Sequence, residues 1–291
     1  MIGNFIKLAL RHMSKNVTYV MINILGLAVG IACFILIGLF VVHELSYDKF
    51  HEKKDEIYRM VLDGKVGEQE VLSAFTPPPM ARTLIDEVPE VIDAIRMNSW
   101  GETPIKIEDR VIIEDGIAFA DSSFFNIFSV PLLYGDPETV LNRPRTMVLS
   151  RSTALRYFGK EDPVGEALRV GTDTSFYQVT GVFQDLPDQS HFDFNLLASF
   201  VSLGVHSREI WLNNNLATYI LTVKGADPSV VQDKIQDVVI KYVGPEMVQF
   251  MGATYEDLIN SGGRYGMKLQ NITDIHLQPE IQGEFKTPSA G

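Results

Sequence analysis

The sequence lacks most features on which enzymes and nucleic-acid-binding proteins depend. Its single cysteine, Cys33, excludes an internal disulfide. The net charge of −12 argues against nucleic acid as a partner, because binding to phosphates needs a basic surface. There is no G-x-S-x-G segment of the kind found in serine hydrolases and no G-x-x-x-x-G-K-[ST] phosphate-binding loop. We therefore expect no catalytic residue and no ATP hydrolysis by this chain itself.

Metal-binding motifs are also missing. Residues 51–55, His-Glu-Lys-Lys-Asp, come close to the H-E-x-x-H motif of zinc proteases, but Asp55 stands where the second imidazole ligand should be. The six histidines show no paired metal-ligand spacing. Asp185 and Asp188 lie on either side of Pro187, which favours a solvated turn over an acid–base pair. The sequence therefore predicts neither a metal nor another cofactor.

Charged side chains are absent from residues 19–42. As a helix with a rise of about 1.5 Å per residue, this stretch would be about 36 Å long, slightly more than a hydrocarbon core of about 30 Å. A cleaved signal peptide would have a shorter apolar core and a cleavage site between small residues, whereas this run passes directly into His43 and Glu44. We interpret residues 19–42 as a transmembrane helix, with the lipid bilayer as its partner.

One face of this helix carries its only strongly polar residue and two of its glycines. Asn23, Gly26 and Gly30 recur at helical spacing, and the two glycines form a G-x-x-x-G pattern. Small residues let membrane helices approach closely, and a buried amide can hydrogen-bond across the contact. The alternative is that glycine is simply frequent in membrane helices. We favour the first interpretation and predict that this face packs against another membrane helix.

Residues 1–18 combine an apolar face with a basic one. Lys7, Arg11 and Lys15 are the only charged residues before position 43, so the rest of the chain carries a net charge of −15. We expect a basic amphipathic helix lying in the membrane interface; a helix packed on a partner domain would show the same pattern. Short basic flanks favour the cytoplasm, so the N-terminus is predicted to be cytoplasmic and the chain after about residue 43 extracytoplasmic.

Two strand–helix–strand units are predicted beyond the transmembrane helix, in residues 44–103 and 212–291. The stretch that follows the helix, residues 44–59, is dense with charge and is expected to be exposed to water. The first unit comprises a strand at 57–62, a helix at 81–88 and a strand at 91–97. The second comprises a strand at 218–224, a helix capped by Asp227 with the stripe Val231, Ile235, Val238 and Tyr242, and an extended run at 267–277.

The residues between these units, 104–211, are predicted to form an inserted β-rich lobe. Its expected elements are a hairpin of 104–108 with 111–120, a helix capped by Asp121, a helix at 151–158 between Ser150 and Gly159, and strands at 167–170 and 176–183. Phe124, Phe125 and Phe128 are expected to be core residues. The predicted fold class is α+β, a discontinuous domain anchored by one transmembrane helix.

Several stretches together resemble one family. They are YDKFHEKKDEIYR, PEVIDAIR, FFNIFSVPLLYGDPETVLNRPRTMVLSRSTALRYFG, DPVGEAL and ITDIHL at residues 272–277. None is specific alone, but their order and spacing are similar to those of ABC transporter permeases of the MacB/FtsX-like family, in the form found in Bacteroidetes-type bacteria. The resemblance covers nearly all of the chain.

The resemblance implies an inner-membrane protein with a porter-like βαβ lobe and an inserted β-rich lobe on the periplasmic side. It also implies a dimeric permease that works with a cytoplasmic ABC ATPase, on the same or a separate chain, and in some members with a periplasmic adaptor or substrate. Such permeases have at least three further membrane helices after this domain, so we expect the sequence to be a segment of a longer permease.

We therefore expect a non-enzymatic permease subunit that couples cytoplasmic ATP hydrolysis to export or to periplasmic partners. The alternative is a membrane-anchored periplasmic sensor or adaptor without transport activity. The substrate, the identity of the ATPase and the dimer interface do not follow from the residues.

Overall fold

The structure, a computed structural model, describes residues 11, 15, 17–172, 175–204, 210–278 and 280–283. The chain divides into two compact units, Met1–Ser46 and Tyr47–Gly291. The first unit contains helix α2 (Val17–Glu44), which includes the whole predicted transmembrane stretch and is long and apolar enough to cross a membrane. The predicted basic helix of residues 1–18 lies almost entirely outside the described residues.

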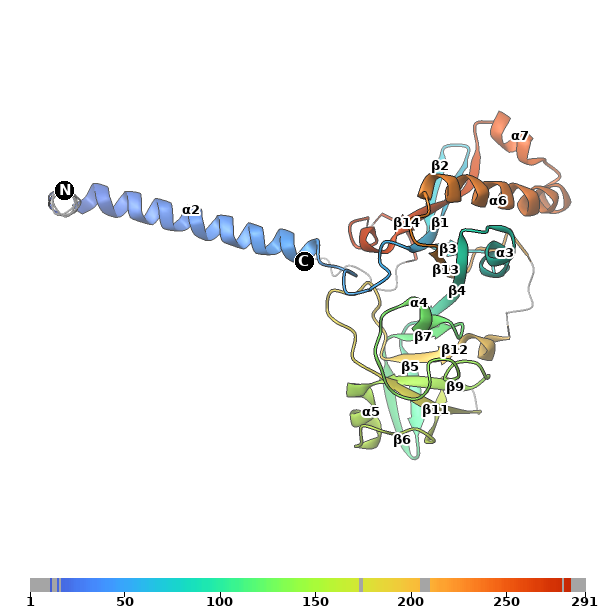
Figure 1. Cartoon of the computed structure of the whole chain (residues 1–291), viewed down its shortest axis with the longest axis horizontal. Coiled ribbons are helices and arrows are strands. Elements are labelled where there is room, and N and C mark those ends of the chain that lie inside the picture. The colour runs from blue at the N-terminus through green and yellow to red at the C-terminus, as the bar shows by residue number, and fades with distance from the viewer. Residues whose placement is uncertain are drawn as a thin grey trace. The chain divides into compact units, whose positions relative to one another are not determined.

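The second unit contains both helices and strands, with runs of two to four consecutive strands between several of the helices (Figure 1). Its strands are β1 (Ile57–Val66), β2 (Gln69–Ser73), β3 (Phe75–Thr76), β4 (Val91–Trp100), β5 (Thr103–Ile107), β6 (Arg110–Glu114), β7 (Ile117–Ala120), β8 (Leu132–Tyr134), β9 (Thr146–Ser150), β10 (Ala167–Val170), β11 (Phe176–Phe183), β12 (Leu196–Ser199), β13 (Leu216–Thr222) and β14 (Arg264–Asn271). Its helices are α3 (Met80–Glu87), α4 (Phe124–Ile127), α5 (Arg151–Phe158), η1 (Phe200–Leu203), α6 (Pro228–Met251), α7 (Tyr255–Asn260) and η2 (Ile272–Asp274).

The described strands form one sheet in the order β14-β1-β13-β4-β7-β12-β9-β11-β10-β5-β6. Three short strands lie off this path: β2 pairs with β1, β3 with β13 and β8 with β11. Most neighbours are antiparallel, and only β7 with β12 and β9 with β11 run parallel among the described strands. A mixed sheet with helices packed on it confirms the predicted α+β class.

The two predicted strand–helix–strand units are β1-α3-β4 and β13-α6-β14, and their strands interleave as β14-β1-β13-β4. All three contacts in this part of the sheet are antiparallel, which is the arrangement of a split βαβ motif. Met60 and Leu62 of β1 pack with Val231 and Ile235 of α6 in one apolar cluster, as their spacing predicts. The lobe boundaries drawn from the sequence stay a prediction.

Helix α6 begins where the sequence predicts and ends later. The side chain of Asp227 accepts a hydrogen bond from the backbone N–H of Ser229, and Pro228 occupies the first turn. The helix continues through Pro245 and ends at Gly252, whose φ of 67° is left-handed. The predicted stripe is therefore only the first half of a helix that reaches Met251.

Helix α5 confirms its predicted caps. The hydroxyl of Ser150 accepts a hydrogen bond from the backbone N–H of Thr153, and Gly159 follows the helix with a φ of 67°. Tyr157 of α5 is buried with apolar residues of β5, β9, β10 and β11 in a second cluster. This cluster places α5 on one face of the sheet.

The predicted strand 111–120 is in fact two strands. Glu114 ends β6, and β7 begins at Ile117 and pairs with β4 and β12 instead of β5. The chain turns at Gly116, whose φ is 95° and where a Cβ would lie 2.6 Å from the carbonyl oxygen of Asp193. Only glycine fits this close approach, and the turn moves the chain from the edge of the sheet to its centre.

Two other predictions were wrong at the level of single residues. Asp121 does not cap α4: its carboxylate accepts hydrogen bonds from the Arg96 guanidinium, and Ser123 occupies the cap position without a side-chain hydrogen bond. The extended run 267–277 stops at Asn271, whose side chain accepts the backbone N–H of Thr273 and starts η2. Asp121 has its partner in strand β4, which its position next to the helix does not indicate, whereas Asn271 forms a local cap that the prediction of one extended run overlooked.

Candidate functional site

Twelve residues join α2 to β1, and the last ten of them, residues 47–56, are named here the junction segment. They are tied to three distant stretches of the second unit. The backbone N–H of Asp48 donates to the carbonyl of Gln189 at 2.8 Å, and that of Glu52 donates to the hydroxyl of Ser129 at 2.9 Å. The Tyr47 ring stacks on His276 with ring centroids 3.4 Å apart. The junction segment is therefore docked on the domain.

At the centre of this docking lies a buried chain of polar groups. Asp48 Oδ1 lies 2.8 Å from Nδ1 of His191, and Nε2 of the same ring lies 3.0 Å from the hydroxyl of Tyr219. The backbone N–H of His191 also donates to Asp48 Oδ1 at 3.2 Å. All three residues are buried. They connect the junction segment, the loop between β11 and β12, and the central strand β13.

His51 completes the group. Its Nδ1 accepts a hydrogen bond from the backbone N–H of Ser129 at 3.1 Å, so the ring proton is on Nε2, which lies 3.8 Å from Asp48 Oδ1. Burial is the main cause that lowers the pKa of His51 to about 4. The neighbouring His191 lowers it further, and the carboxylate of Asp48 offsets part of the effect. His51 is therefore neutral at physiological pH.

The backbone at Asp48 is unusual, because its φ of 56° is left-handed in a residue other than glycine. Aspartate tolerates this region better than most residues. Here both its N–H and its carboxylate bond to the loop that carries Gln189 and His191. Neither Asp48 Oδ2 nor His51 Nε2 has a hydrogen-bond partner among the described residues. The group is closed to solvent, so what it can do is hold the junction segment in one position.

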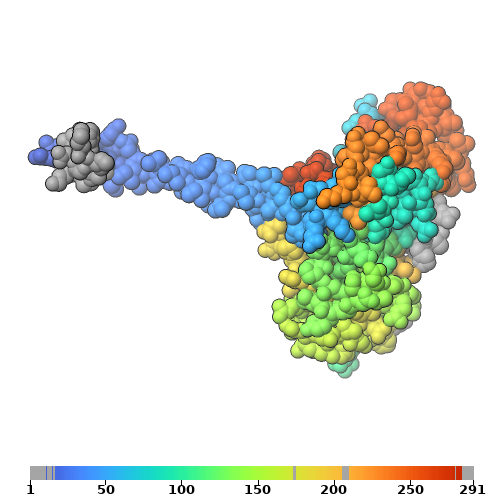
Figure 2. Space-filling model, viewed as in Figure 1, coloured from blue at the N-terminus to red at the C-terminus, as the bar shows by residue number. Residues whose placement is uncertain are grey.

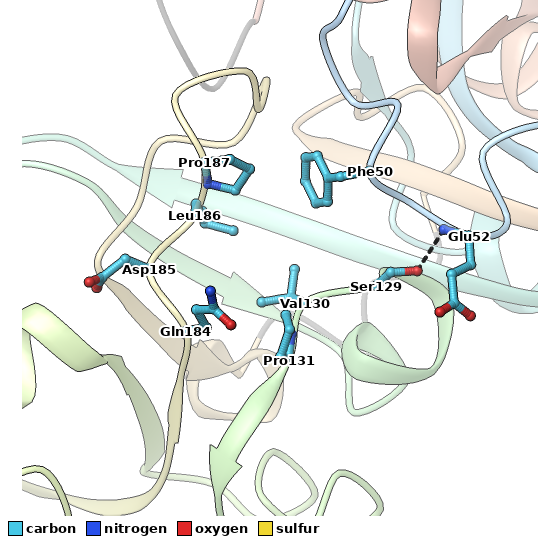
Figure 3. Close-up of a pocket in the computed structure, with 9 residues that line it drawn as sticks. All are labelled: Phe50, Glu52, Ser129, Val130, Pro131, Gln184, Asp185, Leu186 and Pro187. Atoms are coloured by element: carbon cyan, nitrogen blue, oxygen red, sulfur yellow. Dashed lines mark hydrogen bonds between the residues drawn. The ribbon is translucent and has the colours of Figure 1, made fainter.

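Beside this buried group, the surface is hollowed by a cavity of about 390 Å³. Phe50 lies on one side, and Leu186, Pro187 and Val130 face it across the space (Figure 3). The carboxylates of Glu52 and Asp185 point away from the centre in this view. The cavity is thus an apolar depression where the junction segment meets two loops of the inserted portion.

The residues singled out in the sequence lie elsewhere. Asn23, Gly26 and Gly30 lie on α2, three and four residues apart, and therefore share one face. A Cβ at either glycine would meet nothing within 4 Å in the first unit. Packing of this face against a membrane helix stays a prediction. Among the described residues, no group of three His, Cys, Asp or Glu side chains could hold a metal ion.

Sequence reasoning missed the buried group. It treated the charged residues after the transmembrane helix as exposed, whereas Asp48 and His51 are buried. It also treated His51 only as a failed zinc motif. Asp185 and Asp188 are exposed, as expected, and the carboxylate of Asp185 accepts the backbone N–H of Ser152. The three-residue spacing of Asp48 and His51 within an otherwise charged run was the only available signal.

Comparison with known proteins assigns the chain to a family. Residues 20–238 match the MacB-like periplasmic core domain family. No curated relative matches the chain. Among solved structures, a domain of a protein assigned as a permease from Porphyromonas gingivalis is 22% identical with a TM-score of 0.61, over 76% of this chain and 91% of that one. This likeness shows a shared fold.

Two other solved structures are similar at lower scores. The periplasmic region of MacB from Actinobacillus actinomycetemcomitans is 14% identical with a TM-score of 0.49, over 76% of this chain and 91% of that one. The extracellular domain of the ABC-type transporter YknZ from Gram-positive bacteria is 13% identical with a TM-score of 0.46, over 73% and 100%. Because the family match spans well over half of the 291 residues, this chain belongs to the family of the MacB-like periplasmic core domain, found in MacB/FtsX-like ABC transporter permeases.

Proposed function

We propose that this protein is a permease subunit of an ABC-type transporter or mechanotransmission complex, and that its second unit couples ATP hydrolysis by a cytoplasmic ATPase to export or to periplasmic partners. Family membership supports the permease assignment, and the apolar helix α2 supports an inner-membrane anchor. In this proposal the N-terminus is cytoplasmic, the residues after about 43 are periplasmic, and the permease works as a homo- or heterodimer.

The docking of the junction segment is the observation that carries the proposal. Any displacement of α2 along its axis pulls on the first residues of the second unit, because the two are covalently joined. Those residues are bonded to the inserted portion at Ser129 and Gln189 and to the βαβ portion through His276. The segment also makes buried hydrogen bonds through Asp48 and His51, and losing one partner of such a bond costs about 1–3 kcal/mol, so the segment resists separation from the domain. Motion of the helix would therefore move the domain as a body.

The first test is recovery of the ATPase. The tagged full-length protein is solubilised from native membranes and purified, and ATP hydrolysis is measured in the eluate. We expect an ATPase to co-purify. An eluate of clean permease without nucleotide hydrolysis would contradict the proposal and favour a membrane-anchored sensor or adaptor.

The second test addresses transmission of motion. A flexible Gly-Ser insertion between Ser46 and Tyr47 should leave ATPase recovery intact but uncouple the second unit from α2. The matched control is the same insertion after Gly67, in the exposed turn between β1 and β2. Hydrogen exchange of residues 47–291 is compared with and without a non-hydrolysable ATP analogue. We expect a nucleotide-dependent change in the unmodified protein and in the control but not after the insertion at Ser46. Equal changes in all three would refute transmission through the junction segment.

A further inference from the structure

The sheet of the second unit ends in a strand whose exposed side chains are apolar. Strand β6 is the last in the strand order and pairs only with β5 among the described strands. Val111 and Ile113 point to the same side of β6 and are 62% and 61% exposed. In Figure 1 the β5–β6 hairpin lies at the lower end of the domain, and in Figure 2 its atoms project there. Strand β6 is therefore an accessible edge.

The opposite edge of the sheet is protected in a way that β6 is not. Strand β14 carries Arg264 and Lys268 on one side, and both form ion pairs with Asp63. Charged side chains on an edge strand discourage another chain from pairing with it. Strand β6 has no proline, no register shift in its pairing with β5, and apolar side chains in the corresponding positions. An edge of this kind is a template for strand addition.

We propose that β6 pairs antiparallel with β6 of a second copy of this chain, about a two-fold axis through Ile112. In this register Val111 of each copy lies opposite Ile113 of the other, so four apolar side chains meet on the exposed face. Ile112 lies opposite itself. Arg110 of each copy lies opposite Glu114 of the other. In its own copy Arg110 donates to the carbonyl of Tyr157 and Glu114 is buried, so these positions avoid like charges facing each other but add no new ion pair.

The neighbouring registers are worse. A two-fold axis through Val111 places Ile112 opposite Arg110 and Ile113 level with Asp109 of the hairpin turn, so both isoleucines would face charged residues. An axis through Ile113 places Ile112 opposite Glu114. Glu114 already accepts hydrogen bonds from Arg156 and Tyr157 of its own copy, so its charge selects the register more than it adds affinity. The sequence of β6 thus specifies one self-complementary alignment.

Five residue pairs make a small interface. Stable protein–protein interfaces bury at least about 1,000 Å², so this contact would be transient between free domains. Two copies held in one membrane have an effective concentration that reaches the millimolar range for short connections, and weak contacts then become populated. The inference rests on the proposed function only in that both copies are anchored in the same membrane.

The absence of cysteine from the second unit allows a direct test. In full-length protein carrying Cys33→Ala, Ile112→Cys places two thiols opposite each other only in the proposed register. Facing residues in antiparallel strands have Cα atoms about 4.5–5.5 Å apart, within the range of about 4.4–6.8 Å that a disulfide spans. We expect mild oxidation of native membranes to yield a disulfide-linked dimer.

Matched variants check the register. Val111→Cys alone should give no dimer, because residues two positions out of register are separated along the strand by two residue rises of about 3.4 Å each. Membranes that contain Val111→Cys and Ile113→Cys copies with different tags should give the mixed dimer. Adding Val111→Lys and Ile113→Lys to the Ile112→Cys protein should abolish the linked dimer, because facing lysines repel.

The outcomes separate this inference from the proposed function. ATPase recovery is measured on the same membranes with each variant. If the ATPase co-purifies but Ile112→Cys forms no dimer, or forms one no faster than Gln69→Cys on the exposed strand β2, pairing through β6 is wrong and the permease assignment stands. If Val111→Cys links to itself as readily as Ile112→Cys, the proposed register is wrong.

Discussion

The neutral state of His51 makes the stability of the second unit depend on acid in a specific range of pH. In the unfolded chain the pKa of this histidine is 6.5, and in the folded protein burial lowers it to about 4. Above pH 6.5 the ring is neutral in both states and contributes no pH dependence. Between pH 6.5 and about 4 the unfolded chain binds a proton that the folded protein does not. The free energy of unfolding therefore falls as the pH falls through this range.

The size of the effect follows from the two values. Each pKa unit corresponds to about 1.36 kcal/mol, so the gap between 6.5 and about 4 costs about 3 kcal/mol by the time the pH reaches about 4. Because many domains are stable by only about 5–15 kcal/mol, a loss of this size is measurable. The main reason is burial, which penalises the charged ring, and the neighbouring His191 adds to the penalty. Protonated Nδ1 could also no longer accept the N–H of Ser129.

His51→Asn is the matched variant, because the Asn side-chain oxygen can take the place of Nδ1 as acceptor for Ser129 but cannot titrate. Urea unfolding of the detergent-solubilised chain is followed by the fluorescence of Trp100 and Trp211, both of which lie in the second unit. We expect the variant to be less stable at neutral pH because it fills less of the site. The difference should then shrink by about 3 kcal/mol by about pH 4. Carboxylates titrate in both proteins and cancel. Parallel pH profiles would refute the assignment of a buried neutral His51.

Three further substitutions test single features. Ser150→Ala should lower the free energy of unfolding by about 1 kcal/mol, measured by urea unfolding, because α5 loses its N-cap. Gly116→Ala should cost more than Gly67→Ala in the same assay, because both have positive φ but only Gly116 would bring a Cβ within 2.6 Å of a carbonyl oxygen, that of Asp193. Gly30→Leu should reduce the size of detergent-extracted assemblies if the glycine face of α2 packs on another helix; an unchanged size on native gels would mean that the face is not used.

Sequence predicted the parts of this fold that local signals determine. The cap at Asp227 and the closing glycine at Gly159 lie within a few residues of the groups that they satisfy, so each could be recognised in a short window. The stripe on α6 predicted the side of that helix that packs against β1. The order of strands in the sheet required knowing that the two strand–helix–strand units interleave, which no local pattern encodes.

Two of the missed features depend on partners distant in sequence. Asp121 was predicted to cap the short helix that begins three residues later, but its carboxylate is held by Arg96 of the neighbouring strand β4. Asp48 and His191 are 143 residues apart, and each is flanked by residues typical of exposed loops. A short polar residue in a charged run is normally solvated, so the prediction of exposure followed the common case. Only the structure shows that the loops carrying Ser129 and His191 cover the junction segment.

The chemistry of the buried group explains why a polar contact suits this position better than an apolar one. An apolar cluster of the same volume could be as stable, because buried polar groups lose hydration and regain little net free energy from their hydrogen bonds. It would, however, tolerate several alignments, since apolar contact has no preferred direction. The bonds of Asp48 to the backbone and ring of His191, and of His51 to Ser129, are satisfied in one alignment only. Under the proposed function, a junction segment with one alignment would pass a displacement of α2 on to the domain, whereas one that could slide would absorb it. Paired apolar replacements of Asp48 and His191 that keep the stability but relax the alignment test this argument. We expect the domain of such a variant to stay folded but to stop responding to the nucleotide. Hydrogen exchange with and without an ATP analogue, combined with urea unfolding, measures both properties in one preparation.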